Sequence, residues 1–95
     1  MQEPRELYAD MRTVVPDAPK LDETDPVGKA HMTYFTRLRE QGKLLMAGPF
    51  KEERGGLVIF STSSKEEAIE LSNNDPLIAT GNYKPNVRAW SVGIY

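Results

Sequence analysis

Residues 28–50, GKAHMTYFTRLREQGKLLMAGPF, combine the clearest helix pattern of the chain with its most apolar strand pattern. In the first half, His31, Tyr34, Phe35 and Leu38 lie at positions i, i+3, i+4 and i+7. This spacing puts the four side chains on one face of a helix, and a face of this kind turns toward the core. The only histidine of the chain is therefore predicted to point inward.

Strand patterns lie on both sides of this helix. Gly42 ends the helix pattern, and the apolar run Leu44–Pro49 that follows predicts a buried second strand. Before the helix, ELYADMRTVV (Glu6–Val15) mixes aromatic and β-branched residues and predicts a first strand. The segment Pro16–Val27 has three prolines and four acidic residues, so we expect a long loop, either a solvated connector or a lid.

Capping and turn signals set the next boundaries. Asp25 followed by Pro26 has the pattern of an N-cap with proline at the first helical position, which starts the helix there and runs it to about Gln41. KEERGG (Lys51–Gly56) predicts a polar turn, since its paired glycines tolerate positive φ. The turn leads into a third strand, Leu57–Thr62.

A second helix is predicted next, because Ser63 or Ser64 with Glu66 or Glu67 three residues later is a capping-box pattern. Its expected inward side chains are Ala68, Ile69 and Leu71, and its expected end is Asn73-Asn74.

The carboxyl-terminal part repeats one of these signals. Asp75-Pro76 is a second cap-plus-proline pattern and predicts one more helical turn through Ala79. Val87–Tyr95, which contains Trp90, predicts the closing strand.

The predicted order is β, α, β, β, α, β, so we expect a single α+β domain over residues 1–95 with the ferredoxin-like arrangement and an antiparallel sheet. Right-handed crossovers put both helices on one face of such a sheet. The two middle strands are nevertheless apolar on both sides, which calls for cover on the second face as well. The expected opposing pairs are Leu44 and Met46 against Leu45 and Ala47, and Leu57 and Ile59 against Val58 and Phe60.

A second sheet is the natural cover, so the pattern predicts a homodimer with two sheets face to face.

The composition of the chain limits which other kinds of partner are expected. Lys and Arg total 12 against 14 Asp and Glu, and they are scattered, which argues against nucleic acid. The chain has no cysteine, no apolar leader pattern and no membrane-span pattern, so we expect a soluble cytoplasmic protein without membrane association.

Two residues are candidates for proton chemistry. His31 is the first, because an imidazole exchanges protons near neutral pH, although a core histidine with one buried acceptor has the same spacing. Asp75 is the second, since a carboxylate on one ring nitrogen fixes the tautomer and stabilises the imidazolium. An Asp before Pro is also an ordinary helix cap, as at Asp25, and spacing alone does not show that His31 and Asp75 meet.

The remaining candidates would bind a ligand. Gly48-Pro49 ends the central strand, where a missing side chain lets a ligand approach the backbone or simply terminates the strand. Arg12 is suited to clamping a carboxylate or phenolate, unless it is a solvated surface arginine. Trp90 suits an aromatic pocket, the core or a dimer interface. No metal-ligand cluster, phosphate loop or nucleophile elbow is present in the sequence, so no metal and no cofactor are expected.

Taken together, these blocks resemble the YciI-like, or YCII-related, family. The resemblance rests on His31 one turn into the first helix, GKLLMAGPF (Gly42–Phe50), the paired glycines 55 and 56, SKEEAIELSNNDP (Ser64–Pro76) and the closing Val87–Trp90. It implies a dimeric α/β barrel of ferredoxin-like protomers and a histidine–aspartate pair in a pocket, which falls by motif on His31 and Asp75. It also places Phe50 beside the ligand-binding candidates. The long acidic loop departs from the family pattern.

Members of that family include a dehydrochlorinase of a chlorinated trihydroxybenzene, and related barrels include a muconolactone isomerase. The resemblance therefore implies a small cofactor-independent enzyme in which His31, oriented by Asp75, moves a proton on a small cyclic or aromatic substrate. The alternative is a non-catalytic dimeric module that binds a small ligand or regulates a partner. A third hypothesis is haem binding by His31.

Overall fold

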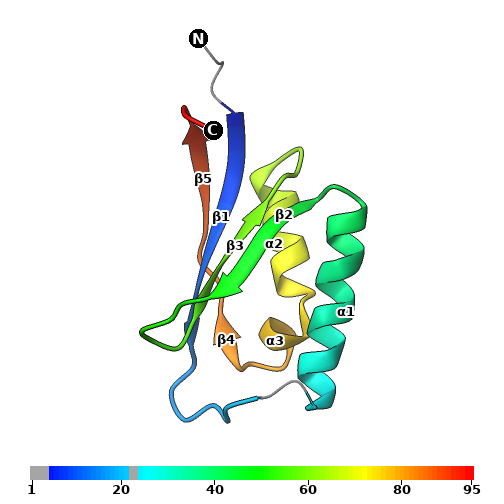
Figure 1. Ribbon diagram of the computed structural model, residues 1–95, viewed down its shortest axis with the longest axis vertical. Helices are drawn as coiled ribbons and strands as arrows, with labels where there is room; N and C mark the ends of the chain where they lie inside the picture. Colours follow the sequence, from blue (N-terminus) through cyan, green and yellow to red (C-terminus); the bar gives the residue numbers. More distant parts are fainter. Residues whose placement is uncertain (1–4, 22–23) are drawn as a thin grey trace.

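The computed structural model describes residues 5–21 and 24–95, and its architecture is α+β with the ferredoxin-like order expected from the sequence (Figure 1). The structure adds one short strand, β4, to the predicted elements. Its helices and strands are β1 (Arg5–Val14), α1 (Pro26–Glu40), β2 (Leu44–Pro49), β3 (Gly56–Phe60), α2 (Lys65–Asn73), α3 (Pro76–Ala79), β4 (Tyr83–Lys84) and β5 (Val87–Val92).

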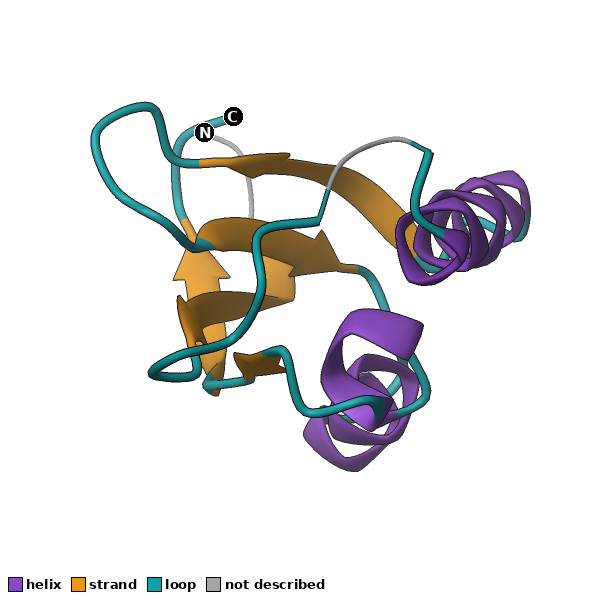
Figure 2. Cartoon of the chain, turned by 90° about the horizontal axis from the view of Figure 1, so that it is seen from below, coloured by secondary structure: helices purple, strands orange, loops and turns teal. Residues whose placement is uncertain are grey.

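The sheet is antiparallel at every pairing between its described strands. β1 lies in the middle, with β3 and then β2 on one side. On its other side β1 pairs first with β5 and then, at its carboxyl end, with β4. Viewed from below, α1 and the α2–α3 segment lie on one side of the sheet (Figure 2). The two crossovers therefore cover the same face, as predicted.

The helix starts follow the capping signals. The Asp25 carboxylate accepts a hydrogen bond from the Val27 backbone N–H at 2.9 Å, and Pro26 is the first residue of α1. In the second helix the N-cap is Ser64, whose Oγ accepts from the Glu67 N–H at 3.1 Å. The loop before α1 is thus shorter than the predicted Pro16–Val27, because its last two residues are helical. Residues 22 and 23 of that predicted loop lie outside the described residues.

Two apolar clusters lie on the two faces of the sheet. The cluster on the helix-covered face consists of Tyr8, Phe35, Leu38, Leu44, Val58, Phe60 and Ala68. The cluster on the opposite face has Leu7, Ile59 and Val92 at its centre. Successive strand residues point to opposite faces, so β1 and β3 contribute to both clusters, as the two-sided pattern of β3 predicted. β2, the other strand predicted to be apolar and covered on both sides, is instead the edge strand of the sheet, and its residues 46–49 are exposed.

Three sequence expectations are wrong in detail. Between Leu44 and Met46 the β2–β3 register shifts, so Leu44 pairs with Phe60 on the helix side while Met46 pairs with Ile59 on the other. This bulge breaks the strict alternation in which Leu44 and Met46 would share a face.

The second correction concerns Ile69, which was expected to point inward. Ile69 is 38% exposed, because it is the next residue after buried Ala68 and therefore points about 100° away from it around the helix axis.

The third correction concerns the end of the chain. β5 ends at Val92, and residues 93–95 lie outside it, whereas the closing strand was predicted to reach Tyr95. Among the residues that the structure describes, no helix has the length and apolar character needed to cross a bilayer.

The turn before β3 requires glycine at Gly55. Its φ is +126°, and a Cβ added there would lie 2.5 Å from the backbone oxygen of Arg12. A backbone oxygen of a central strand cannot move aside without disturbing the ladder. The next residue is also tight, since a Cβ on Gly56 would lie 2.7 Å from the Gly48 oxygen.

We therefore expect Gly55→Ala to lower the free energy of unfolding by about 2 kcal/mol or more, through backbone strain and overpacking. Denaturant unfolding followed by tryptophan fluorescence measures the change. Gly93→Ala is the matched control, because an added Cβ there meets no atom within 4 Å. Equal stability of the two variants would contradict this explanation of the turn.

Candidate functional site

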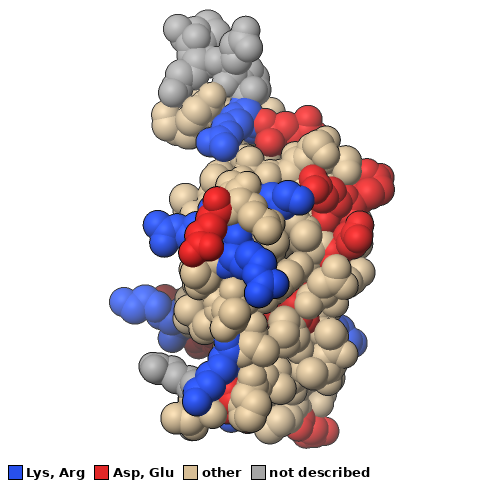
Figure 3. Space-filling model, turned by 90° about the vertical axis from the view of Figure 1, so that its right-hand side faces the viewer, with Lys and Arg blue, Asp and Glu red and all other residues tan. Residues whose placement is uncertain are grey.

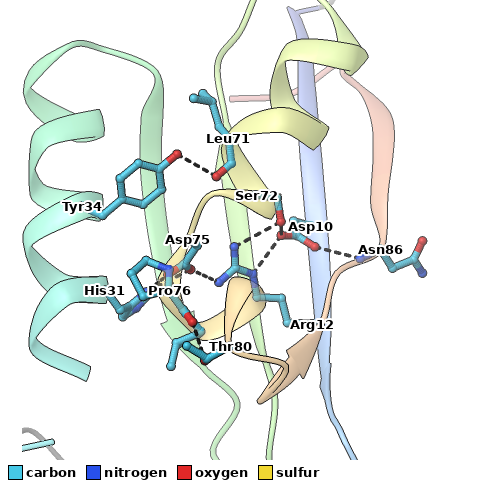
Figure 4. Close-up of polar contacts among 11 residues, drawn as sticks. Asp10, Arg12, His31, Tyr34, Leu71, Ser72, Asp75, Pro76, Thr80 and Asn86 are labelled. Atoms are coloured by element: carbon cyan, nitrogen blue, oxygen red, sulfur yellow. Dashed lines mark hydrogen bonds and ion pairs between the residues drawn. The ribbon is translucent and has the colours of Figure 1, made fainter. Parts of the chain in front are cut away.

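Arg12 lies at the centre of a buried polar network under the helices (Figure 4). Strand alternation puts Tyr8, Asp10 and Arg12 on the helix-covered face, where Arg12 is only 4% exposed. Its Nε donates to Asp10 Oδ2 at 2.9 Å, and its Nη1 donates to Asp75 Oδ2. The third nitrogen, Nη2, donates to Ser72 Oγ at 3.2 Å. One guanidinium thus joins β1 to the end of α2 and to the start of α3.

Asp10 holds Arg12 from the opposite side. The carboxylate is fully buried and accepts a hydrogen bond from Ser72 Oγ at 2.6 Å in addition to the one from Arg12. Its other oxygen accepts from the Asn86 backbone N–H at 2.9 Å. These three hydrogen bonds come from residues of β1, of α2 and of the turn before β5, which keeps the carboxylate in one position.

The structure brings His31 and Asp75 together. The His31 Nδ1 lies 2.9 Å from Asp75 Oδ1 and 3.0 Å from Oδ2, although the two residues are 44 positions apart. Asp75 also caps α3, since its Oδ1 accepts from the Leu77 N–H at 3.1 Å. The carboxylate therefore acts as a helix cap and as the partner of the histidine at once, so the two sequence interpretations of Asp75 do not exclude each other.

The charges around Asp75 favour its ionised form. Burial by itself raises the pKa of the Asp75 carboxyl, but the hydrogen bonds from His31 and Arg12 and the positive charges of these groups outweigh it and hold the pKa below its ordinary value. Asp10 and Asp75 carry two negative charges against the one charge of Arg12. A proton on His31 would bring this cluster of four groups to neutrality.

The orientation of the ring follows from this pairing. An ionised carboxylate only accepts hydrogen bonds, so the Nδ1 of His31 carries the proton and the Nε2 of the neutral ring is the acceptor. The ring also packs against Phe35, with centroids 4.3 Å apart, and its side chain remains 18% exposed. The contact with Asp75 thus uses Nδ1 and leaves Nε2 as the second nitrogen of the ring.

A cavity of about 800 Å³ lies between α1 and the edge strand β2 with its neighbour β3, and His31 and Arg12 belong to its wall. Gly48 and Pro49 line it as well, and a Cβ added to Gly48 would meet no atom within 4 Å. These four predicted residues therefore surround one space. Packing does not require the glycine, so room for a ligand remains beside it.

Two predicted ligand-binding residues lie elsewhere. Phe50 is next to the cavity-lining Pro49 but is not part of the wall. Trp90 pairs with Leu7 and so lies on the sheet face opposite His31, where it is 45% exposed. Within one chain, neither residue contacts the cavity, and their predicted role in binding stays a prediction.

The sequence interpretation missed Asp10 and Ser72. Asp10 had a usable signal, because it lies two residues before Arg12 on the same strand face, where a buried arginine needs a counter-charge. Ser72 had no such signal in the sequence, since a serine in the last turn of a helix is common.

Tyr34, which was expected in the core, donates a hydrogen bond from its hydroxyl to the Leu71 carbonyl at 2.8 Å. Burial, and then the charge of Asp75, raises the pKa of this hydroxyl.

Among the described residues, no group of three or more His, Asp or Glu side chains is arranged to hold a metal ion. On the molecular face that Figure 3 shows, Lys and Arg are interspersed with Asp and Glu, without a continuous basic stripe.

Comparison with known proteins gives three findings. The family model of the YCII-related domain matches residues 7–91. The uncharacterized protein YjpA of Bacillus subtilis (strain 168) is 34% identical over 62 residues, which cover 65% of this chain and 73% of YjpA.

The third finding is a structural likeness. The 5-chloro-2-hydroxyhydroquinone dehydrochlorinase TftG of Burkholderia phenoliruptrix AC1100, solved in complex with 2,5-dihydroxybenzoquinone, superposes with a TM-score of 0.72. The match covers 92% of this chain and 95% of that one at 24% identity. At this identity the likeness is one of fold.

The pairing of Asp75 predicts a pH-dependent stability. Because the folded pKa is below the unfolded value near 3.8, ionised Asp75 stabilises the fold above that value, and the stabilisation is lost as the pH falls through the folded pKa. Asp75→Asn should therefore lower the free energy of unfolding by about 2–4 kcal/mol at pH 7. The difference from the native chain should shrink below about pH 4.

Urea unfolding between pH 7 and pH 2.5 measures this difference. Asp25→Asn is the matched control, because it changes the same Asp-Pro cap at a site where no described Arg or His pairs with the carboxylate, and asparagine caps about as well as aspartate. A deficit of Asp75→Asn that stays constant over the whole pH range would show that the ion pairs contribute nothing.

Proposed function

The chain belongs to the YCII-related domain family, and on that premise we propose that it is a small cofactor-independent enzyme that moves a proton on a hydroxylated cyclic or aromatic substrate. The observation that carries the proposal is the pairing of the His31 Nδ1 with the buried Asp75 carboxylate at 2.9 Å beside the cavity. The pairing leaves Nε2 as the proton acceptor and gives the resulting imidazolium a fixed counter-charge.

A single general base, His31, is sufficient for either of two reactions. In an elimination, the His31 Nε2 takes a proton from a ring hydroxyl or ring carbon, the electron pair moves into the ring, and a substituent such as chloride leaves with its bonding pair. In an isomerisation, the same nitrogen takes a proton from one atom and returns it to another. Neither reaction needs an oxidant or a reductant, and the Asp75 carboxylate stabilises the charged ring in both.

The cavity agrees with a substrate of this kind. Its lining is mostly apolar, with few polar groups, which is the usual composition of a site for small organic molecules. TftG, which shares the fold, acts on a chlorinated hydroxyhydroquinone and binds 2,5-dihydroxybenzoquinone. A hydroxylated six-membered ring is accordingly the first substrate class to test.

A non-catalytic binding module is the second candidate. It is favoured by the observation that Asp75 caps α3 and that Arg12 donates to three protein groups, so the whole network has a structural use without any reaction. In this case the cavity would hold the same class of ligand, and His31 would bind it without turning it over.

We further propose that two chains form a homodimer through the open sheet face, which we define as Leu7, Met11, Ile59, Trp90 and Val92. Trp90, the strand partner of buried Leu7, and Met11, on the same face of β1, are each 45% exposed, so apolar side chains remain exposed around a small core. The helices cover the other face only, and a second copy of the sheet would complete the burial.

His31→Ala should lower kcat/KM by about 10²- to 10⁴-fold, the usual contribution of a positioned general base. Absorbance assays on chlorinated hydroxyhydroquinones and hydroxylated lactones measure it, and thermal unfolding checks the fold. Lys29→Gln is the control, because Lys29 is exposed on the same helix and does not line the cavity. Tight binding of these compounds without any turnover by the native chain would favour the binding module.

For the dimer, light scattering during size-exclusion chromatography should give twice the 10.7 kDa of one chain. Trp90→Glu should shift the mass toward the monomer, because it puts a charge into the apolar open face. Ile69→Lys, a matched exposed site on α2, should leave the mass unchanged. A monomeric native chain at micromolar concentration would refute the proposed dimer.

A further inference from the structure

The cavity is a groove that follows α1 for most of its length. Its lining residues on this helix recur at intervals of three and one, which makes a single stripe, and they are Gly28, His31, Met32, Phe35, Thr36 and Arg39. The opposite wall is β2, all six residues of which line the groove. His31 and Arg39 are eight residues apart, so they lie about 12 Å apart along the helix axis.

Basic residues line the groove at both ends, but only one end carries a positive charge without an ion-pair partner among the described residues. Among the described residues that line it, the charged or titratable ones are Arg12, His31, Arg39 and Tyr83, and none is acidic. Arg12 is neutralised by Asp10 and Asp75. Arg39, in contrast, is exposed and forms no ion pair with any residue that the structure describes. Among the described lining residues, the fixed charge without an ion-pair partner is therefore that of Arg39.

The section between these ends is apolar and adaptable. Met32 and Met46, from opposite walls, are 62% and 65% exposed. Methionine side chains at a rim fit ligands of varied shape because they are flexible and polarisable. Phe35 and Leu44 form the deeper part and are almost completely buried. A ring system without charge fits this section, whereas a second charge does not.

The volume of the groove also favours a ligand longer than one ring. About 800 Å³ lies toward the upper end of the roughly 300–1,000 Å³ that holds drug-sized ligands. A single hydroxylated ring beside His31 would leave most of this space, and the whole Arg39 end, without contacts.

We propose that the groove binds an extended aromatic anion, with a hydroxylated ring at His31 and a carboxylate at Arg39. Arg39 selects the substrate by its charge and takes no part in proton transfer. The inference rests on the proposed function for the role of His31, but anion binding at Arg39 is measurable without any turnover. The substrate class is thus a two-ring or similarly long phenol that carries an acidic group at its far end.

Three probes separate the effect of ligand length on affinity from the effect of ligand charge. They are 4′-hydroxybiphenyl-4-carboxylate, neutral 4-hydroxybiphenyl and the one-ring anion 4-hydroxybenzoate. Isothermal titration calorimetry on the full chain should give the highest affinity for the two-ring anion. Arg39→Gln should lower that affinity by about five- to twenty-fold, as the loss of a hydrogen-bonded charge does. The affinities for the other two probes should stay within about two-fold, because neither reaches Arg39 with a charge.

Arg37→Gln is the matched control, since Arg37 is an arginine in the same last helical turn that does not line the groove. It should change none of the three affinities. Equal loss in both variants, or no loss in Arg39→Gln, would overturn the proposal, and so would binding of the neutral probe as tight as that of the two-ring anion.

His31→Asn separates this proposal from the proposed function. It should abolish turnover of any substrate found and keep the affinity for 4′-hydroxybiphenyl-4-carboxylate within about three-fold, because the carboxylate contact lies at the other end. A charge preference that depends on Arg39 in a chain without enzymatic activity would support the anion groove and refute the enzyme. Turnover of a substrate, together with an affinity for the two-ring anion that does not change in Arg39→Gln, would support the enzyme and refute the anion groove.

Discussion

The carboxylate of Asp75 is the group on which the rest of the site depends. It is completely buried, and a buried charge persists only where hydrogen bonds and an opposite charge replace the lost water. Arg12, His31 and the first turn of α3 supply them from three separate elements. The orientation of the histidine ring is therefore a consequence of how the chain neutralises one internal charge.

The fold and the site use the same atoms. Asp10 and Ser72 fix Arg12, and Arg12 in turn fixes Asp75, so the hydrogen bonds that attach α2 and α3 to the sheet also align the His31 ring. An enzyme gains from such preorganisation, because no group must be reoriented when the proton moves. Because each of these residues also stabilises the fold, the sequence alone was equally compatible with a purely structural role for each of them.

Local patterns accounted for most of the fold. The caps at Asp25 and Asp75 and the spacing along α1 depend on neighbours within one or two turns, and each is visible in the sequence. The bulge at Leu45 and the contact of Arg12 with Asp75, across 63 positions, depend on tertiary structure, which no local pattern encodes. The pairing of His31 with Asp75 was accessible only through the resemblance to a family.

The bulge in β2 connects the two proposed surfaces. Because the register shifts there, Met46 pairs with Ile59 of the open sheet face and also lines the groove. An edge strand that turns side chains toward both surfaces makes them contiguous at this point. If a second chain covers the open face, it comes to lie beside the rim of the groove near Met46. Leu45 and Leu57 also line the groove and pack against the cluster of the open face, so any coupling between groove occupancy and chain association would act through these residues. Such a coupling would be reciprocal, as it is for any two coupled binding events.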